Sequence, residues 1–421
     1  MDSRAPAPAS TPTARRAMRL FKVWFWSPPR PHGDRIIDRR VNPLELLYDL
    51  VFAAVIARAG DHLASQVTGS RFLDFVIVFA LTWIAWTNGT LYLELHGRNN
   101  GRTRSYVFLQ IGILTLLAVF AADPEGPGGQ AFAIAYTAFL VVMVWLWYEV
   151  RRQDIRSGRT EFLFDTAVYV IVMCASVVVI LISAFLPTPV RLAVWAVYTA
   201  AWAVLLLLMA GTRVGLSRGM APTDSLVDRF GTFTLIVLGE VVFGVVDGLS
   251  QSVHDFATIA AGMIALVVGF GFWWIYFDLV GGRLPKGDGR ALANWMLSHF
   301  PITLAIAGAG AGMVSLLEHA HDASTPAATS WLLSGAVALG LLFLIPTSRA
   351  LADSDSLARV YGPVWAAMVA GASLSLIVGG VGPSPWLLAL LLVVVLGLVW
   401  TVAVRGFVLA GAWATEEQPG V

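Results

Sequence analysis

The sequence is poor in charge and almost free of cysteine. Asp, Glu, Lys and Arg make up only 13% of its 421 residues, whereas a soluble domain uses about a quarter of its residues in this way to cover its surface. The single Cys174 excludes an internal disulfide and a cysteine-ligated metal centre. These two absences exclude an ordinary soluble domain and any fold that depends on disulfides.

The sequence also lacks motifs of catalysis and metal binding. It has no His-x-x-x-His or His-Glu-x-x-His motif and no Walker loop. His319 and His321, close to Glu318, are typical of a loop surface, and a weak metal site there is the alternative. We therefore expect no enzyme, no resident metal and no cofactor.

Apolar residues, in contrast, are in excess. They make up 57% of the chain, and the mean hydropathy is +0.73. Apolar runs of about 20 residues, long enough to cross a bilayer, recur along the whole length. We predict an all-α polytopic membrane protein whose twelve transmembrane helices occupy residues 43–65, 72–95, 104–122, 130–150, 162–185, 190–212, 224–248, 256–280, 290–316, 329–349, 357–379 and 385–409.

Positive charge alternates between the loops. Of the 28 Lys and Arg residues, 25 lie in the N-terminal tail, in every second connection after it and at the C-terminal end. Only Arg71 and Arg191 lie in the other loops, and Arg58 lies inside a span. Because cytoplasmic loops carry the excess of Lys and Arg, both termini are predicted to be cytoplasmic.

The first 40 residues differ from the rest of the chain. Pro, Ala and Arg dominate residues 1–20, so we predict a disordered, basic cytoplasmic tail over residues 1–40. This tail lacks the apolar core of a cleaved signal peptide. Residues 21–30, FKVWFWSPPR, are aromatic and basic, and a segment lying on the membrane surface is the alternative to disorder.

An internal repeat divides the remaining chain. YDLVFAAV at 48–55 resembles GEVVFGVV at 239–246, and LYLELHGR at 91–98 resembles IYFDLVGGR at 275–283. A duplication explains both pairs, and chance likeness between apolar strings is the alternative. Halves with an even number of crossings run parallel. We predict two six-helix halves at 41–213 and 214–410, followed by a short C-terminal tail at 411–421.

Two acids interrupt the first span, PLELLYDLVFAAVIARAGDH. Glu45 and Asp49 are four residues apart and share one helix face. A charged group in hydrocarbon costs a few kcal/mol, so it normally faces a partner or a wet cavity. Glu45 follows Pro43 closely and also suits a favourable interaction with the helix dipole, whereas Asp49 lies one turn deeper. We identify both as candidate residues for binding a substrate or ion.

Glu240 is the most isolated charge. It lies about 16 Å beyond Arg229 along the seventh span, at 1.5 Å per residue, and no cation lies within helical reach. A protonated Glu that is hydrogen-bonded for packing is one interpretation, and a carboxylate that binds a proton or cation is the other. Arg229 is either an anchor at the membrane surface or the partner of a carboxylate.

Three further polar residues complete the candidate site. His299 precedes Pro301, which frees a backbone carbonyl one turn back; it is either a satisfied packing residue or a group that titrates near neutral pH. Asn88 lies in the second span, and Asp278 lies at the corresponding end of the eighth. The Trp and Tyr residues around them are typical of the membrane interface.

Several motifs together resemble one known family. These are PLELLYDLVF, a Trp-rich second span, DRFGTFTLIVLGE, WWIYFD and the His-x-Pro of the ninth span. The chain resembles the bacterial low temperature requirement A family over residues 40–410. The family commonly has two aromatics where Leu47 and Tyr48 stand, and often Ser where Val241 stands, so any ligand from that Ser is missing here.

The resemblance implies an integral membrane protein of bacteria but no reaction or substrate. The polar positions of the family map onto Glu45, Asp49, Arg229, Glu240, Asp278 and His299.

We expect a proton- or cation-coupled transporter of a small solute in the bacterial cytoplasmic membrane. Asp49 and Glu240 would then flank a central cavity, with His299 and Asn88 as polar neighbours. The alternative is a non-transporting scaffold, or a sensor of lipid or cold, in which polar groups link helices. An enzyme acting on lipid ranks third because no nucleophile or metal cluster is evident. The expected partners are the lipid bilayer and a small solute or ion, not nucleic acid; the sequence specifies no oligomeric state.

Overall fold

The computed structural model describes residues 12–34, 39, 41–211 and 222–411, and these are almost entirely helical. One isolated bridge between Pro285 and Leu351 is the sole β-type pairing within these ranges. The elements are α1 (Pro12–Trp26), α2 (Pro43–Ala64), α3 (Gly69–His96), α4 (Gly101–Phe120), α5 (Pro127–Arg156), the 3₁₀ turn η1 (Thr160–Phe162), α6 (Leu163–Ser183), α7 (Thr188–Gly211), α8 (Asp224–Gln251), α9 (Phe256–Leu279), α10 (Gly289–Glu318), α11 (Ala327–Arg349), α12 (Ala358–Val381) and α13 (Pro385–Leu409).

Helices α2 to α13 coincide one to one with the twelve predicted spans. Within the described ranges, eleven of them are long and apolar enough to cross a membrane, so the chain is an all-helical, multi-pass membrane protein. The twelfth is α2, whose 22 residues extend about 33 Å. It is long enough to span but carries four charged side chains, Glu45, Asp49, Arg58 and Asp61. Glu45 and Asp49 find a partner inside the protein, whereas Arg58 and Asp61 pair with each other at an exposed position.

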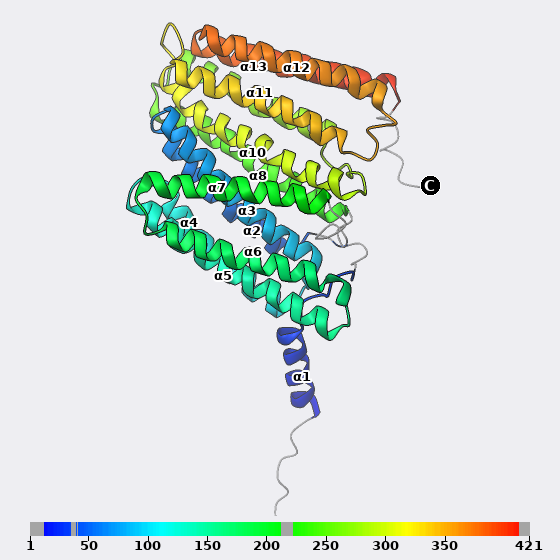
Figure 1. The fold of residues 1–421 in the computed structure, drawn as a ribbon. Coiled ribbons are helices and arrows are strands. Elements are labelled where there is room, and N and C mark those ends of the chain that lie inside the picture. Colours follow the sequence, from blue (N-terminus) through cyan, green and yellow to red (C-terminus); the bar gives the residue numbers. More distant parts are fainter. Residues whose placement is uncertain (1–11, 35–38, 40, 212–221, 412–421) are drawn as a thin grey trace, which may run out of the picture.

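The spanning helices lie side by side along one common direction, from α5 at one edge to α12 and α13 at the other (Figure 1). Short connections make consecutive helices antiparallel. In the most apolar window of α10, 94% of the residues are buried, compared with 83% for α3 and 22% for both α4 and α7. Therefore α10 and α3 form the centre of the bundle, and α4 and α7 face the lipid.

We call the end of the bundle at which α2, α8 and α10 begin the basic end, because most Lys and Arg residues lie there. Asn42 caps the start of α2, where its Oδ1 accepts a hydrogen bond from the Leu44 amide at 3.0 Å. Thr223 caps the start of α8 in the same way. Both helices therefore run from the basic end to the opposite end.

The two halves of the chain share one pattern of packing. In the first half α2 packs on α3 and α4, α5 on α4 and α6, and α7 on α3 and α6. In the second half α8 packs on α9 and α10, α11 on α10 and α12, and α13 on α9 and α12. The helices thus have equivalent neighbours in the order α2 to α7 and α8 to α13.

The contact between the halves is not symmetric. α10 packs against α2, α3 and α7 of the first half, and α2 also packs against α8. By the order of packing, the counterpart of α10 is α4, which packs instead against α1, α2 and α5. A single helix of the second half therefore makes most of the helix contacts between the halves.

The N-terminal segment is more ordered than predicted. We predicted disorder for residues 1–40, but residues 12–26 form α1, which runs across the direction of the spanning helices (Figure 1). Its Met18, Phe21 and Phe25 recur at helical spacing on one face, with Arg16 and Arg19 on another. Residues 1–11 of the predicted tail and nearly all of the C-terminal tail lie outside the described residues, as does the boundary between residues 213 and 214.

The segment that follows α1, residues 27–34, packs against the basic end, and we call it the strap. Arg30 and His32 are buried in it. The Arg30 side chain donates hydrogen bonds to the carbonyl oxygens of Gly97 at 3.0 Å and Glu94 at 2.7 Å. The Nδ1 atom of His32 lies 2.8 Å from the Asp154 carboxylate at the end of α5. These contacts fix the strap against the ends of α3 and α5.

Candidate functional site

A buried ion pair joins the two halves. Asp49 of α2 and Arg229 of α8 each have a side chain that is 0% exposed, and Arg229 Nη2 lies 2.6 Å from Asp49 Oδ1. The indole Nε1 of Trp86 in α3 donates to the same carboxylate oxygen at 2.8 Å. Burying two charges is costly unless each has a close partner and additional hydrogen bonds. The Asp49 carboxylate has both, which explains how α2 carries a charge at this depth.

More charges extend the pair toward the basic end. Arg229 Nη1 lies 3.8 Å from Glu45 Oε2, and Arg39 of the segment before α2 donates to Glu45 Oε1 at 2.7 Å. Arg39 also pairs with Glu94 of α3. The five residues Arg39, Glu45, Asp49, Glu94 and Arg229 form what we call the ion-pair layer.

The ion-pair layer also holds the start of α8. The hydroxyls of Thr223 and Ser225 donate to Glu94 Oε1 at 2.8 Å and 2.7 Å. Glu94 therefore connects α3 of the first half with α8 of the second. Neither Glu94 nor Arg39 belongs to the predicted site. The predicted repeat pairs Glu94 with Asp278, but an acid at the end of a span is unremarkable by itself.

The ion-pair layer is incompletely hydrogen-bonded. The Oδ2 atom of Asp49 and the Nε and Nη1 atoms of Arg229 are buried and make no hydrogen bond to any described residue. A buried polar atom without a hydrogen bond costs about 1–3 kcal/mol. The cost of these atoms offsets part of the stabilisation that the ion pair provides.

Aromatic rings surround the ion pair. Trp86 stacks on Phe233 at 4.0 Å between ring centroids, and Phe230 lies 4.8 Å from Trp86 and 5.0 Å from His299. The carbonyl of Trp295 lies 2.6 Å from His299 Nδ1. Since a carbonyl only accepts, Nδ1 carries the proton, and Nε2 accepts from the Tyr276 hydroxyl at 3.0 Å. Both ring nitrogens of His299 thus have a hydrogen-bond partner, next to the ion-pair layer.

Asn88 and Asp278 lie on other faces of their helices. The Asn88 side chain donates to the Ile84 carbonyl at 2.8 Å and accepts a hydrogen bond from Tyr169 of α6. Asp278 accepts a hydrogen bond from the Trp400 indole of α13 at 2.7 Å. Both contacts stay within one half of the chain. Neither of these hydrogen bonds involves a residue of the ion-pair layer.

Glu240 lines a separate cavity toward the opposite end. This cavity of about 30 Å³ lies between α2, α8 and α10, and Asp61 and Asp247 also line it. We call it the acidic cavity. Asp61 pairs with Arg58 at 2.6 Å, whereas Glu240 forms no ion pair with any described residue. A space of this size holds a water molecule or a small ion.

Glycines bring the helices together at the acidic cavity. A Cβ atom on Gly244 would lie 2.1 Å from the carbonyl oxygen of Gly310, and one on Gly310 would lie 2.6 Å from the carbonyl oxygen of Glu240. The backbones of α8 and α10 are therefore in direct contact. The GAGAG stretch at 308–312 is a packing surface, and it places α10 against Glu240.

The ion-pair layer and the acidic cavity do not share one space. Asp61 lies twelve residues beyond Asp49 on α2, which is about 18 Å along the helix. The buried side chains of Phe52, Phe233 and Val237 lie between the two levels. Asp49 and Glu240, predicted to flank one cavity, are thus found at two levels of the same interface.

Within the described ranges, no group of three or more His, Cys, Asp and Glu side chains is arranged to hold a metal. His321 instead lies 3.1 Å from Asp255, near the opposite end.

Comparison with known proteins gives one match. A family model described as bacterial low temperature requirement A protein (LtrA) matches residues 40–410, which contain the ion-pair layer almost completely and the acidic cavity. No curated protein and no solved structure matches the chain.

Proposed function

We propose that this chain, which belongs to the bacterial low temperature requirement A family, is a proton- or cation-coupled transporter of a small solute. The observation that carries the proposal is the acidic cavity. It places Glu240, Asp61 and Asp247 around one small space at the contact between the halves. Secondary transporters bind substrate and coupling ion at such a contact between repeats.

The predicted duplication supports this proposal. The first half at 41–213 and the second half at 214–410 would be parallel repeats, which the equivalent neighbours of α2 to α7 and α8 to α13 favour. The sequence likeness pairs Asp49 with Glu240, but the two acids lie at different levels of α2 and α8, so the equivalent neighbours and not these two residues support the duplication. The asymmetric place of α10 means that the two halves differ in how they meet.

The charge distribution supports an orientation in the bacterial cytoplasmic membrane. We place the basic end, and with it the N-terminus, in the cytoplasm, because the positive-inside rule favours this arrangement. The acidic cavity then lies toward the outer face. The ion-pair layer closes the route on the cytoplasmic side.

In the proposed transport cycle, the acidic cavity and the ion-pair layer open one after the other. A cation or proton would reach Glu240 from the outer side, while Arg229 holds Asp49 and Glu45 on the inner side. Separation of α2 from α8 would then release Asp49 toward the cytoplasm. The buried layer at Phe52, Phe233 and Val237 prevents both levels from opening together. We assign no catalytic role to any residue.

One observation favours the alternative of a non-transporting scaffold or a sensor of lipid or cold. The centre of the bundle at α10 is 94% buried in its most apolar window, and Asp49 is fully enclosed. In that case the ion-pair layer would only connect helices, as polar groups in membranes often do.

Thermal unfolding of the purified full chain tests the proposal. We would screen inorganic cations, small metabolites and lipids at acid and at alkaline pH, comparing wild type with Glu240→Gln. A ligand at 100 times its Kd stabilises the folded state by about 2.7 kcal/mol. We expect a cation or small solute to raise the Tm of wild type but not of Glu240→Gln.

The matched control is Glu318→Gln, which makes the same change at an exposed position near the end of α10. It should respond to the ligand as wild type does. If only lipids raise the Tm and pH has no influence, transport is refuted and the scaffold alternative stands.

A further inference from the structure

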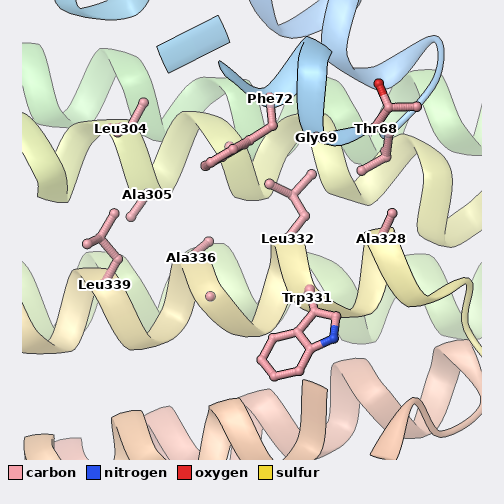
Figure 2. A pocket seen from close by; sticks show the side chains of 13 residues that line it. Thr68, Gly69, Phe72, Leu304, Ala305, Ala328, Trp331, Leu332, Ala336 and Leu339 are labelled. Carbon is pink, nitrogen blue, oxygen red and sulfur yellow. The ribbon is translucent and has the colours of Figure 1, made fainter. Parts of the chain in front are cut away.

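A groove opens on the side of the bundle where the two halves meet. It has a volume of about 430 Å³ and lies between the start of α3, the middle of α10 and the first half of α11. Figure 2 shows Ala305 of α10 facing Ala336 and Leu339 of α11 across it. The groove is separate from the ion-pair layer and from the acidic cavity.

The lining of the groove is suited to a hydrocarbon. Apart from the hydroxyl of Thr68 at one end and the indole nitrogen of Trp331, the side chains that line it are apolar. Small residues at Gly308 and Gly335 make room in its walls, and a Cβ atom on Gly335 would meet nothing within 4 Å. Phe72 and Trp331 are 42% and 50% exposed at its edges. Such a surface gains dispersion contacts when a flexible apolar chain fills it.

The length of the groove matches one leaflet of a bilayer. Along α11 its lining extends from Ala328, at the opposite end of the bundle, to Leu339. These twelve residues are separated by eleven steps of 1.5 Å, which is about 16 Å. Half of a hydrocarbon core of about 30 Å is about 15 Å. An extended chain that enters at the Thr68 end would therefore reach the middle of the membrane.

The length of the groove also argues against a transmembrane helix as the occupant. Such a helix crosses the whole hydrocarbon core of about 30 Å, whereas the lining along α11 covers about 16 Å. A single hydrocarbon chain of one leaflet is the apolar group of the bilayer that matches this length.

We propose that this groove binds one acyl chain of a membrane lipid, whose headgroup lies at the Thr68 end in the leaflet at the opposite end of the bundle. The proposal depends on the bilayer-spanning fold and not on transport. In this proposal the acyl chain packs against Ala305 and Gly308 of α10, while Ala307 and Ala311 of the same helix line the acidic cavity. The bound chain thus supports α10 from the side opposite to Glu240.

We would test the proposal by measuring how much lipid the purified full chain retains. Gly335→Leu places a side chain in the groove at a position where a Cβ atom meets nothing within 4 Å, and Gly397→Leu makes the same change on α13, where the Cβ has the same open space. Both changes raise helix propensity equally. Native mass spectrometry would count lipids per chain, and thermal unfolding would compare added phosphatidylglycerol with long and with short acyl chains.

We expect wild type and Gly397→Leu to retain at least one lipid per protein chain. Their Tm should rise more with long-chain than with short-chain phosphatidylglycerol. Gly335→Leu should lose at least half of the retained lipid and the dependence on chain length. If Gly335→Leu fails to fold, Ala328→Phe narrows the groove from its exposed end and replaces it. Equal retention in the groove variant and wild type, or no lipid in wild type, overturns the proposal.

Discussion

At the scale of the residue, the pair formed by Asp49 and Arg229 is a fully buried contact between the halves. Both side chains are fully enclosed, so removal of one leaves the other buried without a counter-charge. Breaking a buried ion pair in this way costs about 3–5 kcal/mol. We expect Arg229→Met to lower the free energy of unfolding by this amount, measured by denaturant unfolding in detergent.

Two controls accompany this prediction. Arg58→Met removes a pair whose side chains are both 51% exposed, and such a pair contributes under about 1 kcal/mol. The double variant Asp49→Leu with Arg229→Met leaves no buried charge at either position. Its free energy of unfolding should therefore fall by less than that of Arg229→Met alone. A loss equal to the sum of both single variants would show that the residues act independently.

The sequence revealed these charges but not their partners. Asp49 and Arg229 stand out because each interrupts an apolar run, yet they are 180 residues apart and nothing local joins them. Arg39 and Glu94 were missed because charges at the ends of spans are common. His299 and Asn88 have polar side chains whose hydrogen bonds, as found here, are largely to the backbone and to Tyr, which no pattern in the sequence specifies.

At the scale of the element, the contact between α8 and α10 depends on glycine. A methyl group on Gly244 would overlap the backbone of Gly310, and no side-chain movement relieves this overlap. Overpacking of this kind costs about 1–3 kcal/mol. We expect Gly244→Ala to lower the Tm, whereas Gly397→Ala, with open space around its Cβ, should raise it slightly through helix propensity. A Tm of Gly244→Ala at or above wild type would contradict the close approach.

Helix α1 gives a second prediction at this scale. Its aromatic face and its basic face are those of a helix that lies in the membrane interface. In a Cys174→Ser background, a spin label at Phe21→Cys should be accessible to lipid-soluble oxygen, and one at Arg19→Cys to a water-soluble relaxation agent. Equal access of the aqueous agent to both positions would mean that α1 projects into solution.

The sequence predicted the spans well and their packing poorly. Hydropathy located all twelve helices from α2 to α13, because about 20 apolar residues in a row leave few alternatives. The same criterion overlooked α1, whose 15 residues mix Arg and Lys with aromatics. The neighbours of α10 could not be read from its own residues, since its glycines and alanines permit close packing without selecting a partner.

At the scale of the whole molecule, the orientation is open to direct measurement. We expect the basic end in the cytoplasm. In the Cys174→Ser background, a membrane-impermeant thiol reagent should label Asp322→Cys in intact cells but label Asp288→Cys only after permeabilisation. The reverse labelling pattern would mean that the basic end lies outside the cell and the acidic cavity on the cytoplasmic side.

The small-residue surface of α10 has a mechanical consequence for the whole molecule. Where large side chains of one helix insert between the side chains of its neighbour, the helices can move past each other only if these side chains leave their positions. Where α10 meets α8, Gly244 and Gly310 bring backbone against backbone, with no side chains to interlock. A small displacement of α10 along its own axis therefore meets little steric resistance there, as in shear motions between packed helices. Because α8 and α10 both belong to the second half, this contact lets α10 shift relative to its neighbour α8, while α8 stays joined to α2 of the first half through Arg229 and Asp49.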